Sequence, residues 1–581
     1  MNEGHANLVW ARTLLRSLAA GGLEHVVVAP GSRSTPLVLA AYDTEELTVD
    51  VHLDERSAGY YALGRGRASA VPTAVITTSG TATANLHPAV MEANHSRVPL
   101  LILTADRPPE LHESDANQTM RQDDLYGSAV RWSRTLPEVS DDPHRRRAVA
   151  SIGARAVAEA TGSYPGPVHL NCPFRKPLQP NAADEMAEAR TAEIPPLPQI
   201  HTPRSRPTVS QLRGLISSVE SFDRGLIVVG PGCLDRVSAD AIIEFARLVG
   251  YPIFADPVSG IRFHPRADEL VCGGYDGYLH GPVVNELPTP ELVIRIGPPP
   301  TSQPLQAFLD SEEATQVLLD PRPQWRDPTY RIDTLIRGDP ASILTAASDE
   351  LSGLTPGIWL DTIQHAEMTY WSTADSILAG RYFEGAIARA VSSILPEGHA
   401  LFVSNSMPVR DLDRFGEPRG DDLYVYGNRG VSGIDGIVSS ALGVGDVLDT
   451  PVAILTGDLA LYHDMNGLEA IERFDLDATI VVINNDGGGI FHKLPIEEMD
   501  PPFEAMFKTP HGRSFEAVAE QYGLGYASVH GRTDLAEALG VLSNGGRSLI
   551  ECHIDAERSH EIRSFVTGEL RRSVAEAITD G

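Results

Sequence analysis

The sequence has almost no lysine. Lys176, Lys493 and Lys508 are its only lysines in 581 residues, so arginine supplies the other 44 of its 47 basic side chains. Asp and Glu number 78, and the formal net charge is −31. Charge of this sign repels a polyphosphate backbone, so we expect no nucleic-acid partner. An acidic protein from a GC-rich genome would explain the arginines alone. Adaptation to a salt-rich cytoplasm explains both features, and we favour this second interpretation.

Cysteine is also scarce, and no cysteine lies near another in the sequence. The four are Cys172, Cys233, Cys272 and Cys552, and none forms a CxxC pair. This spacing excludes a disulfide framework and a cysteine-rich zinc site, so we expect four buried thiols in a reducing compartment.

Long hydrophobic runs and a secretory leader are missing as well. The longest apolar runs, such as Val98–Leu103, have the length of a strand and fall well short of the roughly 20 residues that cross a bilayer. The first residues, MNEGHANLVWARTLL, lack a basic region followed by an apolar core. We therefore expect a cytoplasmic protein with no membrane partner.

Short, continuously apolar segments alternate with helical stretches along the whole chain. Segments such as HVVVAP, GLIVVGPG and PVAILTGD are typical of parallel strands buried on both faces. The pattern predicts an α/β protein of three consecutive parallel-sheet domains, at residues 1–180, 208–345 and 378–570. Residues 177–207 are rich in Pro and Ala and are interpreted as a linker, and residues 339–378 as a second, partly helical connection. The glycine turn of GLIVVGPG lacks a full GxGxxG, so we interpret it as an ordinary strand-to-helix turn.

The third domain contains the strongest local pattern. An apolar strand ends at Gly457 and Asp458, a helical segment follows, and a second apolar strand ends at Asn484, Asn485 and Asp486 before the glycines 487–489. Parallel strands joined by a helix place both ends at one sheet edge, where such sheets bind ligands. An Asp and an Asn there suit Mg²⁺, and the glycines allow a phosphate to approach. Turns also favour these residue types, but the combined spacing favours a metal–diphosphate clamp.

Glu55 follows a predicted strand in the first domain and begins a predicted helix. An acid at a helix start commonly interacts with the helix dipole, so alone it would be interpreted as a cap.

Together these segments resemble thiamine-diphosphate enzymes, whose GDG and NN motifs are about two dozen residues apart. Leu459 in this chain replaces the third glycine of that motif. The segments APGSRSTPL, TSGTATANLHPAV, LTADRPPELHESDANQTM, SNSMPVRD and YGNRGVSGIDG further resemble the 2-succinyl-5-enolpyruvyl-6-hydroxy-3-cyclohexene-1-carboxylate (SEPHCHC) synthase family. The resemblance runs from Leu8 to about Phe565. It implies a pyruvate-decarboxylase-like architecture, with an N-terminal pyrimidine-binding domain, a central domain and a C-terminal diphosphate-binding domain.

The resemblance also implies the chemistry and the partners. Members of the family release CO₂ from 2-oxoglutarate on thiamine diphosphate and add the remaining four carbons to isochorismate, in menaquinone biosynthesis. The cofactors implied are thiamine diphosphate and Mg²⁺ or Mn²⁺. The partner implied is a second copy of the chain, in a homodimer or homotetramer whose sites are shared between chains. The two substrates carry four carboxylates, which arginine binds bidentately.

Roles for individual residues follow from the same motifs. Glu55 would hydrogen-bond the cofactor's aminopyrimidine in a dry pocket that raises its pKa, and Asn117 and Gln118 would contact the reacting groups. Substrates would be held by Ser32, Arg33, Arg107, Ser406, Arg410 and Arg429. The cofactor would contact Ile434, Gly457, Ile490 and Phe491, and the metal would bind Asp458, Asn485 and the Gly487 carbonyl.

One position departs from the family pattern. Gln303 lies where the family commonly has a lysine in the middle domain. Either an arginine compensates for the missing charge, or isochorismate is held more weakly by this chain.

Two other functions are also compatible with the sequence. One is another thiamine-diphosphate-dependent 2-oxoacid decarboxylase or carboligase. The sequence GDL at 457–459, in place of the usual GDG, and the arginine-rich motifs argue against it. The other is an inactive homologue, against which the presence of Glu55, Asp458 and Asn485 counts.

Overall fold

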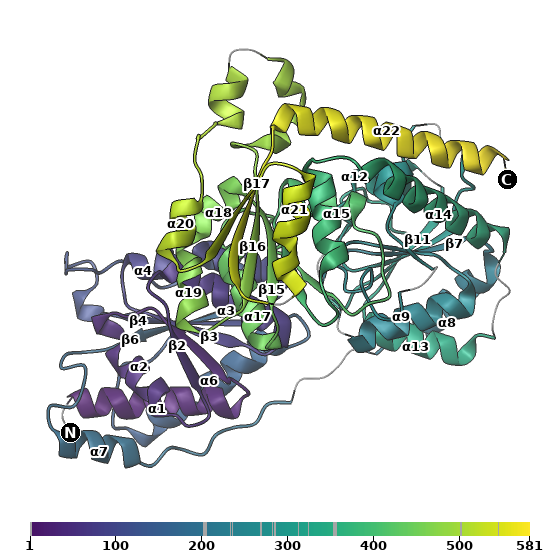
Figure 1. Ribbon diagram of the computed structural model, residues 1–581. Helices are drawn as coiled ribbons and strands as arrows, with labels where there is room; N and C mark the ends of the chain where they lie inside the picture. Colours follow the sequence, from purple (N-terminus) through teal and green to yellow (C-terminus); the bar gives the residue numbers. More distant parts are fainter. Residues whose placement is uncertain are drawn as a thin grey trace. The chain divides into compact units, whose positions relative to one another are not determined.

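The structure is a computed structural model, and its described residues form three parallel sheets of six strands each. It describes the whole chain except residues 1–2, 202–205, 233, 235, 268–269, 282, 284–285, 312, 323–324, 353–356, 500–501, 544 and 581. Every strand pairing in the described residues is parallel, as the continuously apolar segments predict (Figure 1). The predicted three-sheet α/β class is confirmed.

The order of the strands across each sheet differs from their order along the chain. The first sheet is β2 (Thr48–Val51), β1 (His25–Val28), β3 (Thr73–Thr77), β4 (Leu100–Asp106), β6 (Pro167–Pro173), β5 (Trp132–Thr135). The second sheet is β12 (Thr334–Ile336), β11 (Thr315–Leu319), β10 (Leu292–Ile296), β7 (Gly225–Val229), β8 (Ile253–Ala255), β9 (Val271–Cys272). The third sheet is β14 (Tyr424–Tyr426), β13 (Ala400–Val403), β15 (Val452–Gly457), β16 (Ala478–Asn484), β18 (Arg547–His553), β17 (Gly525–Val529).

The internal contacts divide the chain into two compact units. The N-terminal unit comprises Met1–Pro203, Gly430–Asp449 and Asp464–Leu476, and the C-terminal unit comprises the remainder. The first sheet belongs to the N-terminal unit, and the second and third sheets belong to the C-terminal unit. Each unit therefore has its own hydrophobic core, which in the C-terminal unit consists of more than one cluster.

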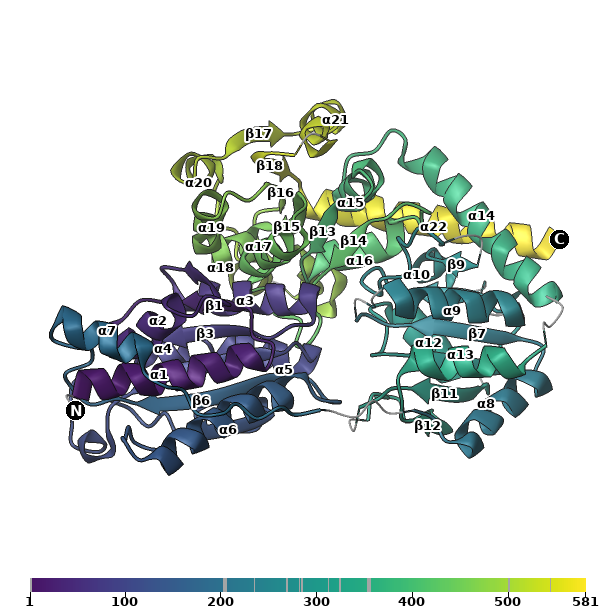
Figure 2. The ribbon, with the colours of Figure 1, turned by 90° about the horizontal axis from the view of Figure 1, so that it is seen from below.

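In the N-terminal unit, one helical layer is built around α1 (Glu3–Ala20). This helix contacts α2 (Thr35–Tyr42), α6 (Pro143–Thr161) and α7 (Ala183–Thr191) (Figure 2). Helix α7 lies within the predicted linker, so that prediction is wrong for these nine residues. The Arg12 guanidinium of α1 donates to the Ala189 carbonyl, and Ala189 is fully buried, so this helix forms part of the core.

A second helical pair in this unit joins distant parts of the sequence. Helix α3 (Glu55–Ser69) packs along α17 (Ile437–Leu448). Two glycines allow the close approach. A Cβ on Gly64 would lie 2.0 Å from the Ser440 carbonyl oxygen, and one on Gly443 would lie 2.1 Å from the Tyr61 carbonyl oxygen. Neither backbone oxygen can move away cheaply, so any larger residue would separate the two helices.

In the C-terminal unit, the second sheet is covered partly by α8 (Val209–Ser221), α9 (Arg236–Val249) and α13 (Pro340–Glu350), which pack together. The predicted connection at 339–378 is largely helical, as α13 and α14 (Ile358–Leu378). Helix α14 lies beside α22 (Ala556–Asp580), the long helix that ends the chain (Figures 1 and 2). A shared core joins these two helices to the second sheet.

Two further expectations concern the cysteines and the membrane. Cys172, Cys272 and Cys552 are buried free thiols as predicted, and Cys233 lies outside the described residues. Within the described residues, every helix is too short or too polar to serve as a bilayer span.

Candidate active site

The predicted clamp lies at the carboxyl ends of two paired strands of the third sheet. Strands β15 and β16 are in register, with Gly457 opposite Ile483. Asp458 begins α18 (Asp458–Asp464) directly after β15, and its Oδ2 accepts the Gly487 N–H at 2.9 Å. The two motifs, about two dozen residues apart in the sequence, therefore meet at one sheet edge.

The two adjacent asparagines have different roles. Asn484 is fully engaged, because its amide donates to the Arg513 carbonyl and to Glu551 and its Oδ1 accepts the Asp486 N–H. Asn485 donates from Nδ2 to Glu384 Oε1 at 2.7 Å, but its Oδ1 is buried without a hydrogen-bond partner in the described residues. Such an oxygen is a natural ligand for a hard cation. The structure thus distinguishes Asn485 from its neighbour.

The glycines beside the clamp are at positions of close backbone packing or of open space. Gly487 has φ +122°, and a Cβ there would lie 2.0 Å from the Lys508 carbonyl oxygen. Its own carbonyl accepts the Gly489 N–H at 2.9 Å and keeps a second lone pair. No described atom lies within 4 Å of the Cβ position of Gly457, so the space beside Asp458 is open. Ile490 and Phe491 follow in a half-buried 3₁₀ turn, Gly489–Lys493.

His511 completes the surroundings of Asp458, and no motif predicted it. Its Nε2 lies 3.1 Å from Asp458 Oδ2, while its Nδ1 accepts the Arg513 N–H at 3.0 Å. In the neutral ring, Nε2 therefore carries the proton and donates to the carboxylate. His511 and Gly512 also donate their backbone N–H groups to Asp486. Nothing in the sequence around residue 511 signals this contact.

Burial raises the pKa of Asp458, although the hydrogen bonds from Gly487, His511 and Leu459 oppose the shift. A divalent cation beside this carboxylate would favour its charged form again. The donor set of one carboxylate, one free amide oxygen and one backbone carbonyl fits Mg²⁺ or Mn²⁺.

Two arginines of the C-terminal unit lie close together without a full complement of partners. Arg410 Nη1 donates to the Ser406 carbonyl, and Arg429 donates to Asn405 at 2.6 Å and to Thr301 at 3.2 Å. Arg429 Nε is buried and unpartnered in the described residues. Burial and then the charge of Arg429 lower the pKa of Arg410. Two guanidiniums that repel each other make a receptor for a dicarboxylate.

Ser406 shapes the turn between β13 and α16 (Met407–Phe415). Its φ of +68° is in the region that non-glycine residues rarely adopt. Its hydroxyl makes no capping hydrogen bond to α16, so the half-buried side chain remains available to a ligand. Strain of this kind is concentrated at functional sites.

In the N-terminal unit, Glu55 is the first residue of α3 but does not cap it. The cap is Asp54, whose side chain accepts the Arg56 N–H at 2.9 Å. Glu55 is half-buried and accepts a hydrogen bond from Asn85 at 3.2 Å. Glu55 is therefore not the N-cap, because the residue before it fills that role, although Glu55 is an acid in the first turn of the helix.

Arg33 and Arg107 are brought together at the carboxyl ends of the first sheet. Both are buried, and both have their pKa lowered, first by burial; for Arg33 the charge of Arg107 is the next cause. Arg33 donates to the Phe174 carbonyl at 2.8 Å, and Arg107 contacts the Ser79 hydroxyl. Ser79 was not among the predicted site residues, although it lies in the TSGTATANLHPAV segment.

The other predicted residues of this unit lie on exposed turns nearby. Gln118 has φ +57° and donates to the Ser79 carbonyl at 2.9 Å. Asn117 and Ser32 are exposed, and the described residues provide no hydrogen-bond partner for either side chain. Gln118 thus joins the Arg107 and Ser79 cluster, whereas contacts for Asn117 and Ser32 remain predictions.

The segment that contains Ile434 is held by an acid that no motif predicted. Glu92 is buried and accepts the backbone N–H groups of Gly430 and Val431, each at 2.8 Å. Beyond Ile434, Asp435 accepts the Tyr60 hydroxyl at 2.5 Å. Ile434 itself is half-buried, so part of its side chain is free to meet a ligand.

Gln303 begins α12 (Gln303–Ser311) and is exposed. Thr301, two residues earlier, accepts the hydrogen bond from Arg429. An arginine therefore lies against the loop that lacks the expected lysine.

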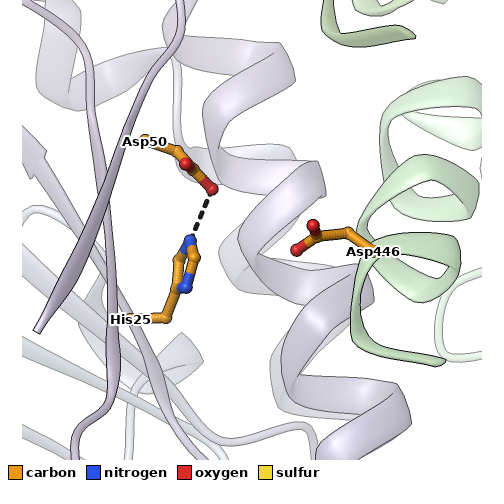
Figure 3. Close-up of side chains that lie close together, drawn as sticks. All are labelled: His25, Asp50 and Asp446. Atoms are coloured by element: carbon orange, nitrogen blue, oxygen red, sulfur yellow. Dashed lines mark hydrogen bonds and ion pairs between the residues drawn. The ribbon is translucent and has the colours of Figure 1, made fainter. Parts of the chain in front are cut away.

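A third cluster lies at the opposite end of the first sheet. His25 begins β1 and lies 2.5 Å from Asp50 of β2, and Asp446 approaches them from α17 (Figure 3). Their potential ligand atoms are within 4.8 Å of one another. However, Asp446 forms an ion pair with Arg65 of α3, and Asp50 is occupied by His25. The arginine supplies the positive charge, so we assign no metal to this cluster.

Three protein-family models match consecutive parts of the chain. The thiamine pyrophosphate enzyme N-terminal domain matches residues 9–126, the middle domain of thiamine pyrophosphate enzymes matches 208–403, and the C-terminal domain matches 423–552. The last match contains Asp458, Asn485 and Gly487.

Curated relatives extend the similarity over the full length. A SEPHCHC synthase of Halobacterium salinarum is 47% identical and covers 97% of this chain and 98% of its own. The one of Haloarcula marismortui is 44% identical and covers 99% and 100%, and that of a Roseiflexus species is 42% identical and covers 95% and 96%. Among solved structures, benzoylformate decarboxylase from Polynucleobacter necessarius superposes with a TM-score of 0.74 at 18% identity, covering 96% of this chain and 99% of its own.

Proposed function

Because this chain belongs to the 2-succinyl-5-enolpyruvyl-6-hydroxy-3-cyclohexene-1-carboxylate synthase family of thiamine-diphosphate enzymes, we propose that it catalyses that family's reaction. It releases CO₂ from 2-oxoglutarate and joins the remaining four carbons to isochorismate, as a transferase of menaquinone biosynthesis. The observation that supports this most directly is the unpartnered Oδ1 of Asn485 beside Asp458, where the family's cofactor motif predicts a metal ligand.

The cofactor site follows from these donors. Asp458, Asn485 and the Gly487 carbonyl would hold Mg²⁺ or Mn²⁺, and this cation would neutralise charge on the diphosphate of thiamine diphosphate. Gly457, Ile434, Ile490 and Phe491 would contact the cofactor. The bound cofactor supplies the electron sink for decarboxylation.

The substrate site uses the two arginine pairs. Arg410 and Arg429, with Ser406, would hold the carboxylates of 2-oxoglutarate. Arg33 and Arg107, with Ser32, Asn117 and Gln118, would hold isochorismate. The two guanidinium groups of each pair repel each other until a dianion binds between them. Dicarboxylates are therefore favoured over monocarboxylates such as pyruvate. Arg429 would also provide the charge that Gln303 lacks.

The assembly and location are part of the same proposal. Residues 1–180 would bind the pyrimidine, residues 378–570 the diphosphate, and residues 208–345 would form the central domain. Glu55 of one chain would meet the clamp of a partner chain, so a homodimer is the minimum active unit and a homotetramer is allowed. The buried free thiols suit the reducing cytoplasm.

The test is turnover by purified protein with thiamine diphosphate, Mg²⁺, 2-oxoglutarate and isochorismate, at high KCl. We expect CO₂ release coupled to formation of the isochorismate adduct. CO₂ without adduct would support a different carboligase, and no release from any 2-oxoacid would indicate an inactive homologue. Light scattering of the active sample gives the oligomeric state.

A further inference from the structure

The amide of Asn485 has two chemically different ends in a buried place. Its Nδ2 donates to Glu384 Oε1 at 2.7 Å, and its Oδ1 has no partner in the described residues. An amide that rotated by half a turn would present N–H groups where Oδ1 now lies. Only one of these two orientations provides a metal ligand.

Glu384 determines the orientation because an ionised carboxylate only accepts hydrogen bonds. If Asn485 turned its oxygen toward Glu384, two acceptors would face each other in a buried site, which is costly. Glu384 is 2% exposed, so water does not relieve such a contact. The carboxylate therefore points the amide oxygen of Asn485 away from itself.

Glu384 is itself fixed by a buried arginine. Arg563 contacts Glu384 Oε2 and donates two hydrogen bonds, both 2.9 Å long, to the two carboxylate oxygens of Asp411. Arg563 is 5% exposed and Asp411 is 1% exposed. One guanidinium between two carboxylates leaves the group acceptor-rich, which favours a nearby cation.

These side chains come from separate elements. Glu384 is the first residue of α15 (Glu384–Ile394), Asp411 lies on α16, and Arg563 lies on α22. The hydrogen-bond chain thus extends from the last helix of the protein to the end of β16. Apart from Asn485, none of its members belongs to the GD or NN motif.

We propose that Glu384 is a positioning residue that holds Asn485 with Oδ1 toward the metal of the diphosphate clamp. This inference rests on the proposed function, because it assumes that Asn485 binds the cofactor's cation. Mutation of the hydrogen-bond partner of a metal ligand typically weakens metal binding by about 10- to 100-fold.

The test compares Glu384→Gln with Glu384→Ala. The glutamine keeps an acceptor for Arg563 only by turning its NH₂ toward Asn485, which then flips and presents its own NH₂ to the metal. The alanine removes the carboxylate, so the Asn485 amide can adopt either orientation. We expect about 10- to 100-fold weaker Mn²⁺ binding for glutamine and a smaller loss for alanine, whereas alanine lowers the melting temperature more.

Mn²⁺ binding to the full-length protein is measured by electron paramagnetic resonance with saturating thiamine diphosphate at high KCl. The matched control is Glu367→Gln. Glu367 is also a buried carboxylate, and it accepts bonds from Gly273, Gly274, Tyr278 and Trp371, away from the clamp. We expect its Mn²⁺ affinity to stay within twofold of the wild type, even if its melting temperature falls.

The outcomes separate this inference from the proposed function. Wild-type protein that does not bind Mn²⁺ with thiamine diphosphate overturns both. Wild-type binding together with unchanged affinity in Glu384→Gln, or a larger affinity loss in alanine than in glutamine, overturns the positioning role alone. If the glutamine variant does not fold, Glu384→Asp replaces it. The shorter carboxylate withdraws from Asn485, and at least threefold weaker binding is expected; unchanged affinity again overturns the role.

Discussion

Neighbouring residues of the candidate site differ in how many of their hydrogen-bonding atoms are occupied. Asn484 and Asn485 are identical in type and adjacent in sequence, yet one is saturated by Arg513, Glu551 and Asp486 and the other keeps an open oxygen. Asp54 and Glu55 differ in the same way, because the first caps α3 and the second does not. In both pairs, the residue that makes fewer hydrogen bonds is the one that the family motif assigns to the cofactor.

Glu55 gives the first prediction at this scale. Replacing it by glutamine removes the acid that would exchange a proton with the aminopyrimidine but changes its size little. We expect turnover to fall at least about 100-fold, while calorimetry still detects thiamine diphosphate binding. The neighbouring variant Asp54→Asn keeps a capping side chain and should retain turnover. Wild-type-like activity of Glu55→Gln would refute its assigned role.

Arg410 gives the second prediction. Truncation to alanine removes a charged donor next to Arg429, so the KM for 2-oxoglutarate should rise about 10- to 100-fold, because a hydrogen bond to a charged group contributes about 1.5–3 kcal/mol. Steady-state kinetics measures the effect. Arg572→Ala serves as control, since the exposed Arg572 pairs with the half-buried Glu569 on its own helix and with no other acid in the described residues. Unchanged kinetics in Arg410→Ala would remove this residue from the site.

Asp464 gives a prediction on pH. It accepts hydrogen bonds from the N–H and hydroxyl of Ser439, and burial raises its pKa to about 7. Because the folded state holds this proton more tightly than the unfolded state, its contribution to stability is complete below about pH 4 and is lost as pH rises through 7. At pH 8, the free energy of unfolding of Asp464→Asn should therefore exceed that of the wild type by about 1–4 kcal/mol. At pH 4, the two free energies should differ little. Denaturant unfolding at several pH values at high KCl checks this, and an equal difference at every pH would contradict it.

At the scale of elements, the sequence predicted the inner strands and missed several outer ones. No continuous apolar run marks β5, β9, β12 or β17 in the sequence, and all four lie at sheet edges. An edge strand is short and partly exposed, so it lacks the continuous apolar run that identifies an inner strand. Helix α7 was missed for a related reason, since its alanines and acids resemble a linker until α1 covers one face.

The packing of α3 on α17 leads to a prediction at this scale. In Gly443→Val, the new Cβ would collide with the Tyr61 carbonyl oxygen. We expect a loss of about 2–4 kcal/mol in the free energy of unfolding, from the forced separation of the helices. Gly568→Ala is the control, because Gly568 lies in α22 with open space at its Cβ and should gain up to about 1 kcal/mol. Denaturant unfolding at high KCl measures both, and equal effects would show that the close packing is unimportant.

At the scale of the whole molecule, the charge of −31 and the anionic ligands need different explanations. Arginines are paired within each unit, Arg33 with Arg107 and Arg410 with Arg429, so positive charge is concentrated locally in a chain of negative net charge. Net charge therefore argues against a nucleic-acid partner but does not describe the active site. Two of the similar synthases come from Halobacterium and Haloarcula, in accord with the preferred interpretation of the acidity.

Salt dependence is the prediction at this scale. Molar salt shortens the screening length to about 3 Å, whereas dilute buffer lets the acidic groups repel one another over about 10 Å or more. We expect the protein to lose structure and activity below about molar KCl. Circular dichroism and turnover across a KCl series measure this. A melting temperature and activity that do not change in dilute buffer would favour the codon-usage explanation instead.

The sequence by itself determined the α/β class, the three sheets and the family, because buried parallel strands and cofactor motifs are local patterns of residue type. It also singled out Asp458 and Asn485 for the same reason. Only the tertiary structure decided which asparagine has a free oxygen, that His511 and Glu384 surround the clamp, and that Asp54 rather than Glu55 caps α3. Around the clamp, these facts depend on buried side chains up to 179 residues apart, and at α3 they depend on which carboxylate reaches the Arg56 N–H, so hydrogen-bond geometry rather than residue type determines each role.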